Sequence, residues 1–283
     1  MASWLAEVPT SDVPDSADLS SSEAIAADAS ANLHVAWLGN AGLEYREYLR
    51  NVGWAGAAER VDTLDEAWDA PCIAVDNAGD VHVIWWTYTG VSGEIYYREK
   101  HILTGWDATP TLLGNPKVDE RSPSIAVDSQ GVVHVVSCKT QPLIGPRIRY
   151  EFKDPVSGWV DGSIISQAEG GTAPVICVDS QDNLHVAWVG GNNDIYYRKC
   201  THGIGWDATT TQLTTDGTND EPCVAADGLG CVHVAWRHGG ITGEIKYKKY
   251  VPGNGWDAAV TAISVVDSLY SCHPSIAADQ SGA

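Results

Sequence analysis

An aspartate and a histidine recur at constant spacing along this 283-residue chain, and such a pair could do acid–base or metal chemistry. Asp76 lies six residues before His82 across a short predicted turn, and Asp179 and His185 repeat the arrangement. A carboxylate beside an imidazole can orient a general base, and both groups are metal ligands. The pair occurs in five copies, however, and one active site does not need five. We therefore expect a structural hydrogen bond between the first and second strands of each repeat, which satisfies buried polar groups.

These pairs belong to an internal repeat of about 50 residues, a length typical of one structural unit. An aspartate ends an apolar run, a His-Val pair follows in five copies, and a Gly-Trp pair comes later. The anchoring aspartates are Asp28, Asp76, Asp128, Asp179, Asp227 and Asp279. A residue present in every repeat serves to build the repeat, so binding or catalytic groups are expected where the repeats differ.

Each repeat holds four short segments rich in β-branched and aromatic residues, separated by turn residues. In the second repeat these segments are Cys72–Asp76, Val81–Trp86, Glu94–Glu99 and Trp106–Leu113. Four short strands repeated around an axis predict an all-β protein, a β-propeller of four-stranded antiparallel blades. We expect residues 1–283 to form this single domain.

The ends of the chain leave two blade numbers open. Trp4–Val8 matches a fourth strand and Pro274–Asp279 matches a first strand, but the middle pair of strands occurs only five times. We expect six blades, with both ends in one incomplete blade; a five-bladed ring and a fragment of a longer array are the alternatives. An incomplete blade has open strand edges, which predicts a homo-oligomer formed through that gap.

The composition of the chain limits the classes of partner that the protein is expected to bind. The net charge of −20 argues against nucleic acid and anionic membranes. There is no run of eighteen apolar residues to span a membrane, and no signal peptide is visible at Met1–Trp4. The seven cysteines contain no C-x-x-C pair, which predicts reduced, buried thiols. We expect no cofactor and no metal site.

The loops that follow second strands and those that join repeats should share one face, and they vary in length. Variable loops on a rigid frame are where binding usually occurs. Four repeats end the second strand with a tryptophan beside this face, whereas the third has Ser137, and the missing indole predicts a pocket. The candidate ligand-binding residues are Trp86, Tyr88, Arg121, Ser137, Lys139, Arg147, Arg237 and His238.

The repeat resembles the BNR or sialidase-like propeller repeats of microbial surface proteins. The resemblance rests on Ser124–Asp128 with Val133–Val135, and on Asn183–Trp188 with Asp194–Arg198, and it covers nearly the whole chain. It implies the propeller fold and an extracellular or cell-surface location. The Asp-box of that family is present only as a remnant such as Gly203–Asp207, and the Arg-Ile-Pro motif of the sialidase enzymes is absent.

A non-catalytic, lectin-like module that binds glycans is the expected function, because aromatic faces stack on sugars and polar side chains bond hydroxyls. A sialidase-type glycoside hydrolase is the alternative. The resemblance implies that such an enzyme would need an arginine cluster and an acid. A structural or engineered propeller without a small-molecule ligand is the third possibility. The candidates for the arginines and the acid are Arg121, Arg147, Arg237, Glu120 and Glu221.

Overall fold

A computed structural model describes residues 23–39, 42–63, 67–116, 118–239, 243–264 and 271–279. Within these ranges the chain forms strands and turns but no helix, so it contains no helix able to cross a bilayer. Every strand pair is antiparallel, which confirms the prediction of an all-β protein made of antiparallel blades.

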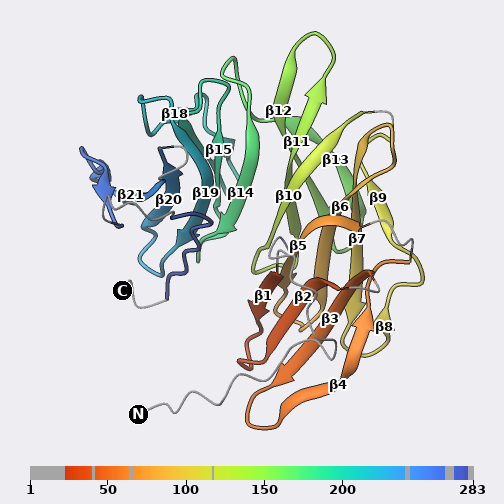
Figure 1. The fold of residues 1–283 in the computed structure, drawn as a ribbon. Coiled ribbons are helices and arrows are strands. Elements are labelled where there is room, and N and C mark those ends of the chain that lie inside the picture. Colours follow the sequence, from red (N-terminus) through yellow and green to blue (C-terminus); the bar gives the residue numbers. More distant parts are fainter. Residues whose placement is uncertain are drawn as a thin grey trace.

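The strands form five sheets, called blades one to five, in which the first four strands follow one another in sequence order (Figure 1). The strands of the first three blades are β1 (Glu23–Ala27), β2 (Leu33–Gly39), β3 (Gly42–Leu49) and β4 (Gly53–Arg60); β5 (Ala67–Val75), β6 (Val81–Tyr88), β7 (Gly93–His101), β8 (Gly105–Trp106) and β9 (Thr111–Leu113); and β10 (Glu120–Val127), β11 (Val133–Gln141), β12 (Gly145–Asp154) and β13 (Gly158–Ile164). Those of blades four and five are β14 (Thr172–Val178), β15 (Leu184–Val189), β16 (Ile195–Thr201), β17 (Gly205–Trp206) and β18 (Thr211–Gln212); and β19 (Asn219–Ala226), β20 (Val232–His238), β21 (Glu244–Val251), β22 (Gly255–Trp256) and β23 (Thr261–Ala262).

The predicted fourth strand is interrupted in blades two, four and five. In blade two it divides into β8 and β9, which both pair with β7. The interruption occurs where the Asp107 carbonyl accepts two hydrogen bonds from the guanidinium of Arg98. Arg98 thus binds a carbonyl beside the sheet, and the ladder resumes at Thr111.

The blades pack face to face, with a hydrophobic core between each consecutive pair. The first strands contact one another in the order β1, β5, β10, β14 and β19. Second strands are covered on both faces, and all six residues of β15 are buried. This explains why these strands are almost continuously apolar in sequence. The seven cysteines are free, but only Cys138 and Cys231 are buried, so the prediction of buried thiols is wrong for the other five, which are partly exposed.

An Asp–His–Tyr brace, largely buried, joins the first three strands of a blade, and its histidine–tyrosine contact is present in all five described blades. In blade four, His185 Nδ1 lies 2.7 Å from the hydroxyl of Tyr197, and His185 Nε2 lies 3.0 Å from Asp179 Oδ2. The Asp179 Oδ1 atom accepts the backbone N–H groups of Gln181 and Asn183, which closes the turn. The predicted Asp–His hydrogen bond is present in blades three, four and five. In blades one and two the same two atoms lie 3.7 Å apart, as an ion pair without a hydrogen bond. The tyrosine partner was not foreseen. The other four histidine–tyrosine pairs are His34–Tyr45, His82–Tyr97, His134–Tyr150 and His233–Tyr247, at 2.7–2.9 Å.

The repeated Gly-Trp pair connects each brace to the next blade. The indole of Trp256 meets the ring of Tyr197 edge-on, with centroids 4.9 Å apart. Trp159 meets Tyr97 in the same way, also at 4.9 Å. The tyrosines of blades one to four therefore bond their own histidines and pack against the tryptophan of the following blade.

The first strand predicted at Pro274–Asp279 is not a strand, and this part of the prediction is wrong. A strand needs a neighbouring ladder, and residues 271–279 make only separate contacts, such as the 2.7 Å bond from His273 N–H to Glu221 Oε2. The segment still has the local backbone of a first strand, since His273 has φ 51° before a proline, as Ala173 and Glu221 do. The fourth strand predicted at Trp4–Val8 lies outside the described residues, so six blades and self-association through the gap stay predictions.

Replacing His185 with alanine removes one partner from Tyr197 and one from Asp179, both in the interior. We expect a loss of roughly 1–3 kcal/mol in the free energy of unfolding, measured by urea denaturation, because buried polar groups are left unsatisfied. The matched control is His202→Ala, which truncates an exposed histidine of the same blade. Equal stabilities for the two variants would contradict a structural role for the brace.

Candidate functional site

Blade three departs from the repeat in adjacent positions of its second and third strands. Where blades two and four stack Trp85 on Tyr96 and Trp188 on Tyr196, blade three pairs Ser137 with Arg149. Two residues further along the third strand, it has Glu151 where blades two and four have arginine. None of these substitutions is needed to build a blade.

The arginine missing at Glu151 is an inter-blade clamp elsewhere. Arg98 Nη1 donates to the carbonyl of Val61 in the preceding blade at 2.6 Å, and Lys248 Nζ donates to Leu213 at 3.2 Å. The equivalent carbonyl for blade three belongs to Leu113, and a carboxylate cannot donate to it. A cleft of about 390 Å³ lies at this place, between blades two and three. This blade-three cleft is lined by residues 111–115, Lys139, Arg149, Glu151 and residues 159–161.

Arg149 organises the charges of the blade-three cleft. Its Nη1 lies 2.6 Å from Glu151 Oε1 and 3.3 Å from Glu120 Oε2, and its Nη2 lies 2.7 Å from Asp161 Oδ1. Lys139 Nζ adds a contact of 3.2 Å to Glu120 Oε1. One guanidinium is thus shared by three carboxylates, two of them buried and one exposed at the mouth.

The tryptophan missing from blade three does not leave an empty hole. Ser137 is 1 % exposed, and its hydroxyl lies 3.5 Å from Glu120 Oε2. Glu120 occupies the strand position that glycine holds in blade four, where Gly171 leaves room for the indole of Trp188. A carboxylate therefore fills the space of the indole, and the opening lies to one side, at Lys139 and Arg149.

Two carboxyl groups of the cleft differ in acidity. Burial raises the pKa of Glu151, and the nearby charges of Glu120 and Asp161 add to that effect. The hydrogen bond from Arg149 lowers the pKa of the exposed Asp161. The pKa values of the two groups are thus shifted in opposite directions, so Glu151 releases its proton at a higher pH than Asp161 does.

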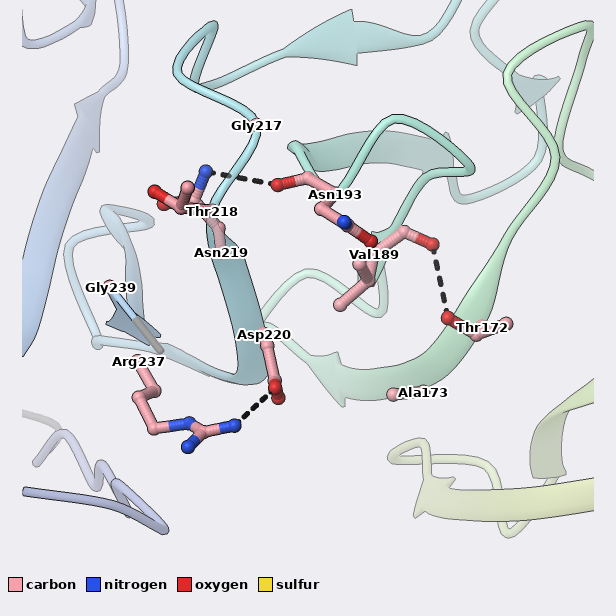
Figure 2. A pocket seen from close by; sticks show the side chains of 10 residues that line it. All are labelled: Thr172, Ala173, Val189, Asn193, Gly217, Thr218, Asn219, Asp220, Arg237 and Gly239. Atoms are coloured by element: carbon pink, nitrogen blue, oxygen red, sulfur yellow. Dashed lines mark hydrogen bonds and ion pairs between the residues drawn. The ribbon is translucent and has the colours of Figure 1, made fainter. Parts of the chain in front are cut away.

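A second cleft, of about 510 Å³, lies between blades four and five (Figure 2). The predicted residue Arg237 lines it and forms ion pairs with Asp220 and, at 3.5 Å, with Glu221. The predicted His238 is adjacent, with Nδ1 3.1 Å from Asn219 Oδ1. Its walls are mostly amide, hydroxyl and backbone groups, without an aromatic ring.

Three other predicted residues are brought together across blades two and three. The guanidinium of Arg121 lies 5.6 Å from the ring centroid of Trp86 and 6.0 Å from that of Tyr88, and it pairs with Asp119 at 2.9 Å. Arg147 lies apart from this group and donates to the carbonyl of Pro146. The eight candidate residues thus belong to separate places and not to one pocket.

A tyrosine–glutamate pair is present in blade two, but in the interior. The Tyr97 hydroxyl donates to Glu99 Oε2 at 2.9 Å, and both residues are buried. Burial raises the pKa of Tyr97, so its phenol stays protonated. A protonated, enclosed phenol is a poor nucleophile, and its hydroxyl already bonds His82.

Arg149, Glu151, Asp161 and Trp159 were not among the predicted site residues. The sequence does contain a signal for the first two. The third strands of blades two and four have Tyr-Tyr-Arg, whereas blade three has Arg-Tyr-Glu at the same register. Asp161 lies on β13 and reaches Arg149 only because the two strands pair, so no spacing along the chain reveals it.

Comparisons with known proteins show which solved structures share this fold. No family sequence model and no curated protein matches the chain. Among solved structures, the BP39L lectin from Burkholderia pseudomallei aligns with a TM-score of 0.68 at 13% identity, over 87% of this chain and 71% of that one. An α-L-arabinanase of Penicillium chrysogenum complexed with arabinobiose aligns with a TM-score of 0.65 at 10% identity, over 94% and 86%.

The Hadza microbial sialidase Hz136 also matches, with a TM-score of 0.52 at 12% identity over 83% of this chain. The match spans about 55% of the length of that sialidase. These likenesses confirm a β-propeller of the sialidase-like kind. At such low identity they show the fold alone.

The substitution Glu151→Gln tests the raised pKa of Glu151. A raised pKa in the folded state means that Glu151 contributes stability below its ordinary pKa of about 4.3 and loses that contribution as the pH rises. The neutral glutamine has no such loss, so the stability of the variant relative to the original chain should increase between about pH 4 and pH 7. Urea denaturation of both proteins across this range measures the difference, and a difference that falls or stays constant would contradict the assignment.

Proposed function

We propose that this protein is a non-catalytic carbohydrate-binding propeller that binds a neutral glycan in the blade-three cleft. The main observation behind this proposal is that Ser137, Arg149 and Glu151 differ from the repeat and all lie beside one cleft, although the fold requires none of them. A lectin and an arabinanase complexed with arabinobiose among the structural neighbours support a carbohydrate ligand.

The lining groups suit the two sides of a sugar. Trp159 is half-buried and lines the cleft, so part of its indole is open for stacking on sugar C–H groups. Arg149, Glu151 and Asp161 are planar polar groups, which can bond two neighbouring hydroxyls at once. An apolar ring beside a few convergent polar groups is typical of small-ligand sites.

The charge of the cleft favours a neutral ligand over an acidic one. Arg149 is already compensated by Glu120, Glu151 and Asp161, so it has little positive charge to offer a carboxylate or sulfate. The net charge of −20 opposes anionic ligands further. Arg121 and Arg237 each have an aspartate partner as well, which argues against an arginine cluster of sialidase type.

Glycoside hydrolysis in the same cleft is the second candidate. The raised pKa of Glu151 and the lowered pKa of Asp161 are the division that a general acid and its partner carboxylate require. Under this alternative, Glu151 protonates the leaving oxygen and Asp161 acts on the sugar or on a water. Product formation separates this candidate from binding alone.

A variant that copies blade four into blade three tests the proposed site. The four changes are Glu120→Gly, Ser137→Trp, Arg149→Tyr and Glu151→Arg, after Gly171, Trp188, Tyr196 and Arg198. The new arginine can reach the Leu113 carbonyl and close the cleft. We expect the variant to fold at least as stably, since packed residues replace a buried charge cluster. Its affinity for the best ligand of a neutral glycan array should fall at least about tenfold by calorimetry.

The matched control is Arg237→Val, which gives blade five the residue of blade four and changes the other cleft only. We expect the control to bind as the original chain does. Loss of binding in the control, with binding retained in the four-residue variant, would place the ligand in the cleft of Figure 2. No binding to any arrayed glycan would overturn the proposed function, and turnover that Glu151→Gln abolishes would establish the hydrolase.

A further inference from the structure

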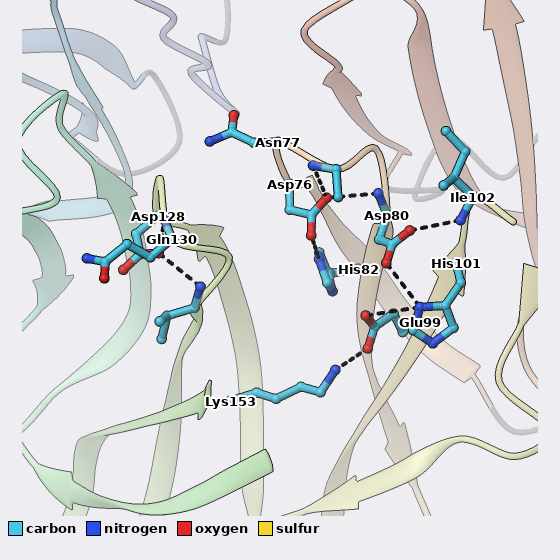
Figure 3. Close-up of polar contacts among 12 residues, drawn as sticks. Asp76, Asn77, Asp80, His82, Glu99, His101, Ile102, Asp128, Gln130 and Lys153 are labelled. Carbon is cyan, nitrogen blue, oxygen red and sulfur yellow. Dashed lines mark hydrogen bonds and ion pairs between the residues drawn. The ribbon is translucent and has the colours of Figure 1, made fainter. Parts of the chain in front are cut away.

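Blade two holds a group of metal-ligating atoms that the repeat does not require. Asp80 Oδ2 lies 3.0 Å from His101 Nδ1, and Glu99 Oε1 lies 3.5 Å from the same nitrogen (Figure 3). All three atoms lie within 4.8 Å of one another. Around a tetrahedral Zn²⁺ with bonds of about 2.0–2.1 Å, ligand atoms are about 3.4 Å apart, and the two distances from His101 Nδ1 match this spacing.

We propose that Asp80, Glu99 and His101 form a binding site for a divalent transition-metal ion such as Zn²⁺. One imidazole nitrogen and two carboxylate oxygens are ligands that such ions accept, whereas Ca²⁺ and Mg²⁺ prefer oxygen alone. The site is independent of the glycan proposed above.

Each ligand residue is held by its remaining polar atom. Asp80 Oδ1 accepts the backbone N–H of Ile102 at 2.8 Å, and Glu99 Oε2 accepts the Tyr97 hydroxyl and pairs with Lys153. His101 Nε2 lies 3.3 Å from Asp107 Oδ1. Without metal, His101 Nδ1–H donates to Asp80 Oδ2. A metal ion would replace this proton, while the Nε2–H would stay on the Asp107 carboxylate. Outer partners of this kind orient metal ligands and strengthen binding.

The exposure of the three side chains suits a site that an ion can enter. The Glu99 side chain is 8% exposed, that of Asp80 is 20% and that of His101 is 39%. The two carboxylates form the inner wall, and the imidazole lies at the surface. An ion bound here keeps room for a water molecule on the open side.

Comparison with the other blades shows that the combination of these three residues is not part of the repeat. The positions equivalent to His101 hold Leu49, Asp154, Thr201 and Val251, and asparagine replaces Asp80 in blades one and four. Blade two alone combines the imidazole with both carboxylates. The competing explanation is a salt bridge of a protonated His101, which predicts no metal affinity.

Titration of the reduced 283-residue chain with ZnCl₂ by calorimetry tests the site, with CoCl₂ absorption as a second readout. We expect one ion per chain, a rise in Tm on metal addition, and a Co²⁺ spectrum without a thiolate charge-transfer band. The band distinguishes this site from adventitious binding to the seven cysteines. His101→Thr and Asp80→Asn introduce residues that blade four carries, so both variants should fold as the original chain does without metal.

Each of these variants should lower Zn²⁺ affinity more than about tenfold, and Asp107→Asn should lower it by about tenfold through the outer partner. Unchanged affinity in both His101→Thr and Asp80→Asn would overturn the proposal. Absence of binding by the original chain, or a thiolate band with Co²⁺, would overturn it as well.

Discussion

The described blades depend on a buried contact between a histidine and a tyrosine, which an aspartate extends by a hydrogen bond in blades three to five and by a 3.7 Å ion pair in blades one and two. In blade four, Asp179 closes the turn after the first strand, His185 lies on the second strand, and Tyr197 lies on the third. The hydrogen bonds from His185 and Asn183 lower the pKa of Asp179 despite its burial. Because buried polar groups are costly when unpaired, these three residues must occur together, and they fix the register of three strands at once.

The brace also explains the spacing of the blades. Tyr197 packs edge-on against Trp256 of the next blade, and Tyr97 packs likewise against Trp159. A signature of Asp, His, Tyr and Gly-Trp in each repeat therefore encodes both the sheet and its stacking. Positions outside this signature and outside the apolar second strands are free to vary, which is where blades two and three acquire their unusual charges.

The repeat could be recognised in the sequence because the aspartate and histidine of the brace keep a constant spacing. The repeat in turn predicted the antiparallel blades and the structural role of the histidines. The tyrosine partner was missed, since Tyr97 reaches His82 only across paired strands. Ser137 marked the unusual blade, but the sequence could not show that Glu120 fills the space of the missing indole. Long-range contacts of this kind depend on sheet register and not on separation along the chain.

The central claim is that the ligand binds where blade three differs from the repeat. A crystal structure of the chain with the oligosaccharide that it binds most tightly tests this claim most directly. We expect sugar density against Trp159, within hydrogen-bonding distance of Glu151 and Asp161, while the Asp–His–Tyr braces keep their contacts. Sugar density in the cleft beside Arg237, with the blade-three cleft occupied only by water, would contradict the account.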